Sequence, residues 1–166
     1  MTTRTDVDAS QLRSVLRSHA AGIVVLTAPG PVGVTITSFT SISAEPALVS
    51  FALAETSSTW QQVRDSEWFG IQILSAEQRD LAQLFASKGA DRFGPATRWR
   101  LGPHGVPLLD DCLSWLVCSR QDTLRIGDHH VVVAAVEHAR QGAPGDSLVH
   151  LHGAMQPVPH PALVRS

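Results

Sequence analysis

The alternation of apolar and hydroxyl-bearing residues is clearest between positions 32 and 43. Three aliphatic residues, at positions 32, 34 and 36, alternate with a glycine and two threonines. Side chains of a β-strand point alternately to its two faces, so this pattern predicts a strand with one aliphatic face and one hydroxyl face. More hydroxyl groups follow, at Ser38, Thr40, Ser41 and Ser43. The stretch suits either a binding surface for a polar ligand or a polar edge strand that runs into a turn.

Other runs of aliphatic and β-branched residues also predict strands. These runs cover residues 22–27, 48–53, 68–74, 112–124, 128–137 and 147–155. An Ala-Pro-Gly-Pro turn at 28–31 joins the first run to the hydroxyl-rich strand, which is typical of a β-hairpin. Strands in hairpin-like succession, with few helices, predict a mainly β fold class. We expect an antiparallel barrel with helical covers rather than a doubly wound parallel sheet.

Three short segments predict helices. Ser10 can cap a helix whose apolar residues, at positions 12, 15 and 16, should cover a sheet. A second helix begins within residues 55–60, directly after a strand. Residues 75–78, Ser-Ala-Glu-Gln, form a capping box before an amphipathic helix that contains Phe85. Lys88 and the glycine after it should end this third helix.

Two segments lack a regular period. Residues 90–111 are rich in Gly, Pro and Arg, and so long a connection is often functional, so we expect a lid or a dimer loop. Three prolines, at positions 157, 159 and 161, predict a trailing tail. The length of 166 residues predicts one domain over 1–166, with a core from about residue 10 to about residue 156.

Composition excludes several classes of partner. Hydrophobic residues make up 43% of the chain, charged residues 17%, and the formal net charge is −2. This balance gives no electrostatic basis for binding nucleic acid or an anionic membrane. The amino terminus lacks a signal-type apolar run and no apolar run can span a bilayer, so we expect a cytoplasmic protein. Cys112 and Cys118 match no zinc or redox spacing and predict reduced, packed thiols.

Candidate chemistry is concentrated at a few polar positions. No glycine-rich dinucleotide motif and no Walker sequence occurs. Ser57, Ser58 and Thr59, at the start of the second helix, offer hydroxyls and free N–H groups that suit a phosphate, although such clusters often only cap a helix. Lys88 could add positive charge to a phosphate site or complement the helix dipole.

A metal site is an alternative. His150-Leu-His152 would place two imidazoles on one strand face, near His129, His130 and His138 of the adjacent strand. No carboxylate follows at a ligand-like spacing, so we expect no metal.

Five motifs, taken in order, resemble the short-chain flavin reductases. They are the stretch from Gly33 to Ser43, Ser57-Ser-Thr-Trp60, Phe85-Ala-Ser-Lys-Gly-Ala-Asp-Arg-Phe93, Gly105-Val-Pro-Leu-Leu109 and Gly127-Asp-His129. The resemblance implies an FMN-binding split β-barrel that is usually a homodimer. It also implies reduction of FMN or FAD with NADH or NADPH, often for a partner flavin-dependent monooxygenase.

The resemblance assigns roles residue by residue. The positions expected near the isoalloxazine and ribityl chain are Thr35, Ile36, Thr37, Ser38 and Ser41. The positions expected near the phosphate are Ser57, Ser58, Thr59 and Lys88. Phe85 and Phe93 are expected near the flavin pocket. His129 falls on the nicotinamide side as the candidate catalytic residue, although a histidine at a strand start can equally be structural. Thr37 and Gln72 stand where the family commonly has Asn. The alternative within this fold is a protein that uses tightly bound flavin directly on a substrate or carries it.

Overall fold

The structure, a computed structural model, describes residues 6–163. The strands are β1 (Ala21–Gly22), β2 (Val24–Ala28), β3 (Val32–Ile36), β4 (Thr40–Ala44), β5 (Ala47–Ala54), β6 (Trp68–Ile73), β7 (Trp99–Leu101), β8 (Pro107–Leu109), β9 (Ser114–Ile126), β10 (His129–Gln141), β11 (Ser147–Leu151) and β12 (Ala154–Val158). The α-helices are α1 (Ala9–Leu16), α2 (Ser58–Val63) and α3 (Arg79–Ala86), with 3₁₀ turns at 76–78, 103–105 and 161–163.

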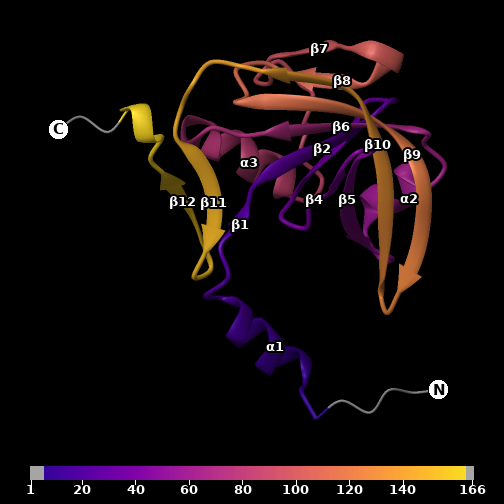
Figure 1. Cartoon of the computed structure of the whole chain (residues 1–166), viewed down its shortest axis with the longest axis vertical. Helices are drawn as coiled ribbons and strands as arrows, with labels where there is room; N and C mark the ends of the chain where they lie inside the picture. Colours follow the sequence, from indigo (N-terminus) through magenta and orange to yellow (C-terminus); the bar gives the residue numbers. More distant parts are fainter. Residues whose placement is uncertain (1–5, 164–166) are drawn as a thin grey trace.

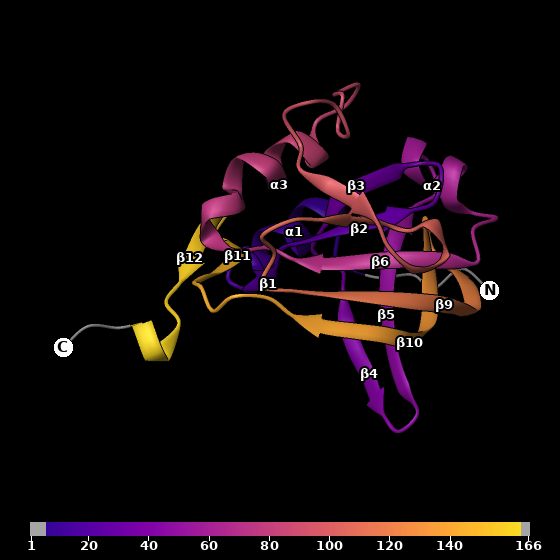
Figure 2. The ribbon, with the colours of Figure 1, turned by 90° about the horizontal axis from the view of Figure 1, so that it is seen from above.

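One large antiparallel sheet dominates the molecule (Figure 1). Its seven strands run in the order β3-β2-β6-β9-β10-β5-β4. Smaller sheets are formed by β1-β11-β12 and by β7-β8. In Figure 2, α2 and α3 lie on one side of the strands, while the β4–β5 hairpin extends to the other side. The predicted mainly β, antiparallel fold class is confirmed.

The aliphatic face of β3 packs as its alternation predicts. Val32, Val34 and Ile36 all contact the main core, which includes Phe51 and Phe69. Strand β2 is buried on both faces, because its alternate residues contribute to two separate core clusters. That double burial explains why residues 22–27 read as a continuous apolar run rather than an alternating one.

The first helix differs from its prediction. Its N-cap is Asp8, whose Oδ1 accepts hydrogen bonds from the N–H groups of Ser10 and Gln11. The apolar residues at positions 12, 15 and 16 are 51%, 74% and 52% exposed, so α1 does not cover the sheet. Arg17 holds its end beside the β11–β12 turn, donating to the carbonyl of His152 and accepting from its N–H, which directs α1 away from the sheet (Figure 1).

Two predicted strands are each interrupted by a turn. The hydroxyl-rich stretch divides into β3 and β4, and β4 pairs with β5. The run at 147–155 divides into β11 and β12 at His152 and Gly153, which both have positive φ. Pro157 pairs with Leu148 inside β12 instead of starting a tail. The second interruption depends on His152 and Gly153 adopting the left-handed region, and alternation alone does not reveal that.

Residues 90–111 contain regular structure, which the missing period did not predict. They contain the β7–β8 hairpin, in which Val106, Leu108 and Leu109 are at most 2% exposed. The indole N–H of Trp99 donates to the carbonyl of Phe93, 3.2 Å away. This burial holds the segment against the rest of the molecule. Within residues 6–163, no helix has both the length and the apolar character needed to cross a membrane.

Candidate functional site

Three of the sequence-predicted segments meet at the end of β5. The Oγ of Ser38 donates to the carbonyl of Ala52 (2.8 Å) and accepts from its N–H (3.0 Å). Ala54, two residues later, pairs with His129 of β10. The N–H of Ser57, which precedes α2, donates to the carbonyl of Ala54 (2.9 Å). The structure therefore brings together the turn after β3, the start of α2 and the start of β10.

Several predicted hydroxyls already bind the protein's own backbone. The Oγ1 of Thr35 donates to the carbonyl of Ala82 in α3 (2.6 Å). The Oγ of Ser57 accepts from the N–H groups of Thr59 and Trp60, so Ser57 is the N-cap of α2. A hydroxyl proton that is committed to one acceptor cannot be donated to a second one in the same geometry. The hydroxyl proton of Thr35 is therefore committed to α3, whereas Ser57 accepts two hydrogen bonds as the N-cap of α2 and keeps its own proton.

Other predicted hydroxyls remain available to a ligand. Thr37, Ser41 and Ser58 are exposed, and within residues 6–163 their hydroxyls have no hydrogen-bond partner. By contrast, Ile36 and Thr59 are buried, at 8% and 2% exposure. The three free hydroxyls lie on the turn after β3, on β4 and in the first turn of α2. Each of the three can donate to a ligand without losing a protein partner.

A second group of predicted residues lies at the other end of β3. The rings of Phe85 and Phe93 meet edge to face, with centroids 5.2 Å apart. A Cβ atom on Gly33 would lie 2.7 Å from Cε1 of Phe85 and 3.1 Å from Cζ of Phe93, so only glycine permits this packing. Lys88 is exposed in the turn that follows α3.

The two groups are separated along the strand. Gly33 and Thr37 are four residues apart, about 13 Å along an extended chain. Because the two phenylalanines lie at Gly33 and the free hydroxyls begin at Thr37, the aromatic rings and the free hydroxyls do not form one compact cluster. An elongated ligand that follows β3 would contact both groups.

His129 stands at the exposed start of β10. Its Nδ1 lies 2.7 Å from Oδ1 of Asp128, and this hydrogen bond lowers the pKa of the Asp128 carboxyl. The His129 side chain is 46% exposed. The buried residues of β10 are Val132 and Ala134, on the opposite face. His129 therefore lies on the outer face of β10.

Sequence reasoning gave no role to His130, which occupies the inner face. Its ring stacks on Trp60 of α2, with centroids 4.2 Å apart. Its Nε2 lies 4.0 Å from Oε1 of Glu55, whose Oε2 forms an ion pair with Arg125 (2.8 Å). Arg125 thus offsets a carboxylate that would otherwise oppose an anion at the start of α2. The doubled histidine in Asp-His-His was the available signal, since adjacent strand residues face opposite sides.

The metal alternative finds no matching arrangement. His150 is on β11, but His152 lies in the following turn with φ of 52°, so the two imidazoles do not share a strand face. Among residues 6–163, no group of three or more His, Cys, Asp or Glu side chains is placed to hold a metal ion.

Comparison with known proteins gives consistent results. Residues 16–159 match the flavin reductase like domain. The chain is 36% identical over 163 residues to an NADH:FMN oxidoreductase of Rhodococcus erythropolis, covering 93% of this chain and 85% of that protein. It is 35% identical over 134 residues to the reductase subunit of a flavin-dependent monooxygenase of Mycobacterium tuberculosis, covering 79% of this chain and 71% of that protein.

Two further comparisons concern length and fold. A probable flavin reductase of Rhizobium meliloti is 37% identical over 133 residues, 78% of this chain, but the match spans only 42% of that longer protein. The crystal structure of a flavin reductase domain protein from Arthrobacter sp. FB24 superposes with a TM-score of 0.86 at 32% identity, covering 93% of this chain and 97% of that one.

The fold and site define a small antiparallel β protein with a hydroxyl-bearing edge strand and no metal cluster among its described residues. The chain belongs to the flavin reductase like family.

Proposed function

We propose that this chain is an NAD(P)H-dependent flavin reductase that transfers a hydride from NADH or NADPH to FMN or FAD. The observation that carries the proposal is the meeting of three segments at the end of β5, where Thr37 and Ser58 leave their hydroxyls free, while Ser41 lies further along β4, opposite Val49. Its support from comparison is the match to the flavin reductase like domain over residues 16–159.

The free hydroxyls suit the polar parts of a flavin. Thr37 and Ser41 would donate to ring and ribityl acceptors, while Thr35, Ile36 and Ser38 would hold the backbone that lies beside them. Ser58 would bind the phosphate at the start of α2, with Ser57 and Thr59 fixing the helix turn and Lys88 adding positive charge. Phe85 and Phe93 would close the apolar end of the pocket.

The protein contributes placement of the reactants to the reaction. Bound flavin supplies the hydride-accepting chemistry. His129 is on the outer face of β10, opposite Ala54 at the end of β5, and its hydrogen bond to Asp128 fixes the orientation of its ring. In this position His129 would orient the nicotinamide and need not move a proton. A reaction of this kind requires no acid-base dyad in the protein, which fits a site made of hydroxyls.

The outer face of β9 and β10 supports a homodimer. Leu124 and Ile126 are 47% and 58% exposed, and they pair with Val131 and His129. Directly opposite residues of antiparallel strands share a face, so this apolar surface continues to His129. A second copy that covers it would remove about 25 cal/mol of unfavourable exposure per Å² and would shield the nicotinamide side. We therefore place the dimer contact on this face.

The reduced flavin would pass to a flavin-dependent monooxygenase. The Mycobacterium tuberculosis relative is the reductase subunit of such an enzyme, and this supports the partner for the present chain. We further propose a cytoplasmic setting, because the buried thiols of Cys112 and Cys118 are both free.

The test is an NAD(P)H oxidation assay with added FMN, FAD and no flavin. A reductase that releases its product should be purified nearly colourless and should consume NADH or NADPH in proportion to added flavin. Protein that is yellow after purification, retains its flavin on dialysis and oxidises no nicotinamide with either added flavin would instead be a flavin-holding protein. Size-exclusion chromatography with light scattering, applied to Leu124→Asp and the wild type, tests the dimer face.

A further inference from the structure

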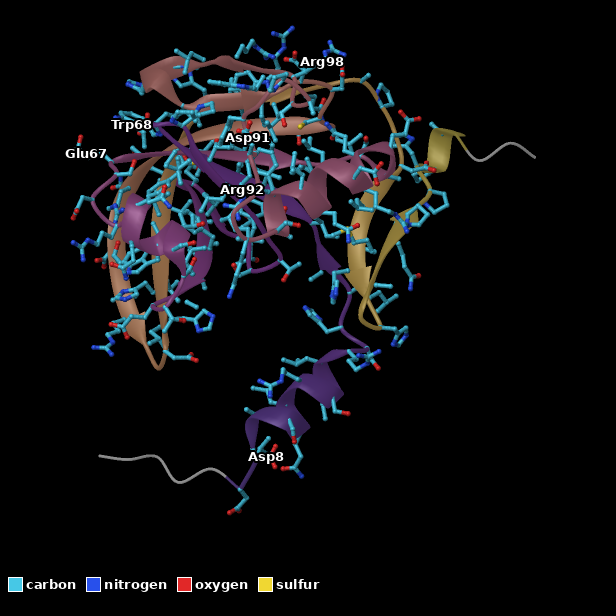
Figure 3. The ribbon with its side chains drawn as sticks, turned by 180° about the vertical axis from the view of Figure 1, so that it is seen from behind. Asp8, Glu67, Trp68, Asp91, Arg92 and Arg98 are labelled. Atoms are coloured by element: carbon cyan, nitrogen blue, oxygen red, sulfur yellow. The ribbon has the colours of Figure 1, made fainter. Side chains whose placement is uncertain are left out.

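Arg92 reaches two parts of the proposed flavin site at once. Its Nη1 donates to the carbonyl of Gly33 in β3 (2.5 Å), and its Nη2 donates to the carbonyl of Ser87 (2.9 Å) at the end of α3. The Oγ1 of Thr97 donates to the carbonyl of Arg92 itself (2.7 Å), so its backbone is fixed from the opposite side. Figure 3 shows Arg92 beside α3.

The hydrogen bond to Ser87 closes the turn that carries Lys88. Ser87 and Arg92 are five residues apart, and Lys88 lies between them with Gly89, whose φ is +69°. Lys88 has no ion pair or hydrogen bond of its own in the described part of the chain. The position of its ammonium group therefore depends on the turn, and the guanidinium of Arg92 helps to hold that turn. The same fork ties this turn to the strand that leads to Thr37.

Arg92 is not an ordinary ion-pair partner. Within residues 6–163, no carboxylate lies within ion-pair distance of its guanidinium, and both hydrogen bonds go to neutral carbonyls. Its Nε is buried and has no partner. Burial lowers the pKa of Arg92 from its ordinary value, and no neighbouring charge offsets this effect. Burying this charge is unfavourable, and the two hydrogen bonds to backbone carbonyls are the interactions that hold it in place.

We propose that Arg92 is a positioning residue of the flavin site, which holds the Lys88 turn against β3 so that Lys88 meets the flavin phosphate. The inference rests on the proposed function. It assigns Arg92 no contact with flavin, and its effect passes through Lys88. Only the phosphate end of the ligand should therefore be sensitive to Arg92.

A guanidinium suits this task better than an ammonium. Its planar fork presents two parallel sets of donors, so one side chain can serve two carbonyls in fixed relative positions. Lysine keeps the charge, but its donors are all on one nitrogen and cannot reach both carbonyls in this geometry, so Arg92→Lys should lose at least one of the two hydrogen bonds. The substitution thereby separates geometry from charge.

The test compares FMN with riboflavin, which lacks the phosphate. Dissociation constants of both ligands are measured by fluorescence quenching for the wild type, Arg92→Lys, Lys88→Ala and the double variant. Arg92→Lys should raise the FMN dissociation constant about tenfold, because the charge-assisted contact of Lys88 with the phosphate is misplaced. The riboflavin dissociation constant should stay unchanged. In the Lys88→Ala background, Arg92→Lys should have almost no further effect on the ratio of the two constants.

Arg98→Lys is the matched control, since Arg98 lies in the same segment, is exposed and pairs with Asp111 at 2.9 Å (Figure 3). It should leave both dissociation constants unchanged. Both ligands are titrated into one preparation, so the ratio is independent of the fraction of folded protein.

Three results would overturn the proposal. The first is that Arg92→Lys raises the dissociation constants of FMN and riboflavin equally. The second is that the ratio of the two constants in Arg92→Lys equals that of the wild type. The third is that the effects of Arg92→Lys and Lys88→Ala on this ratio are additive in the double variant. If Lys88→Ala leaves the ratio unchanged while the wild type still reduces flavin, the positioning role is wrong and the reductase function stands. A wild type that neither binds nor reduces flavin would refute the proposed function, and the positioning role with it.

Discussion

The adjacent serines at the start of α2 allow a sharp test of the site, because the structure gives them different tasks. Ser57 accepts two backbone hydrogen bonds at 3.2 and 3.4 Å, whereas Ser58 is exposed with its hydroxyl unpaired among the described residues. If the phosphate binds here, Ser58→Ala removes a hydrogen bond to a charged group, worth about 1.5–3 kcal/mol. FMN should then bind about 10 to 150 times more weakly, because 1.4 kcal/mol corresponds to a factor of ten.

Ser57→Ala should act on the helix instead. Loss of an N-cap costs about 0.5–2 kcal/mol of stability. For a chain of this size each kcal/mol lowers Tm by about 2–4 °C, so the expected decrease is about 1–8 °C. The change in FMN affinity should be smaller than that for Ser58→Ala.

Calorimetry provides both readouts, with thermal scans for Tm and titrations with FMN and riboflavin for affinity. Riboflavin is the internal control, since Ser58→Ala should leave its dissociation constant unchanged. Equal losses for the two ligands would show that Ser58 does not bind the phosphate. A Ser57→Ala variant with unchanged Tm and strongly weakened FMN binding would reverse the two assignments and refute the reasoning.

Three further predictions concern other parts of the molecule. His129→Ala should leave the FMN dissociation constant unchanged. In steady-state assays it should raise the NADH KM or lower kcat about fivefold, because a positioning hydrogen bond is worth about 1 kcal/mol. A fall in kcat by several orders of magnitude would indicate proton transfer by His129 instead. Thr27→Val should lower the free energy of unfolding in urea by about 2–4 kcal/mol, since the Thr27 hydroxyl donates to a buried carbonyl and accepts from Gln72 Nε2. Gln72→Met should lower it much less, because Gln72 Oε1 is already unpartnered. Equal losses of stability in the two variants would contradict this reasoning. Burial raises the pKa of Cys112 to about 11 and that of Cys118 to about 12. Both thiols should therefore stay protonated at pH 8 and should not react with a thiol-specific disulfide reagent until the protein is unfolded. Rapid labelling of the native protein would contradict this burial.

Local patterns in the sequence were sufficient for most strands. The alternation from Val32 to Ile36 predicted the face that packs on the core, because side chains of an extended backbone must alternate whatever surrounds them. The capping box at 75–78 also depends on near neighbours, and Gln78 Oε1 does accept from the N–H of Ser75. Such features involve residues a few positions apart, so sequence spacing fixes them.

Tertiary structure decided which hydroxyls are free. Thr35 and Thr37 are equivalent in the alternation, yet Thr35 donates to Ala82, 47 residues further along the chain. Nothing local indicates that α3 passes this strand at that point. The unpaired state of Thr37 depends on the same long-range arrangement.

The same reasoning explains the role of α1 and of residues 90–111. An amphipathic face shows that apolar residues are together, but not whether the chain folds back to cover them, and α1 is directed away by its contact with His152. Residues 90–111 lack a period because Val106, Leu108 and Leu109 are buried in a hairpin of only three residues per strand. Strands this short are too brief to display an alternation, so only packing against the large sheet determines their structure.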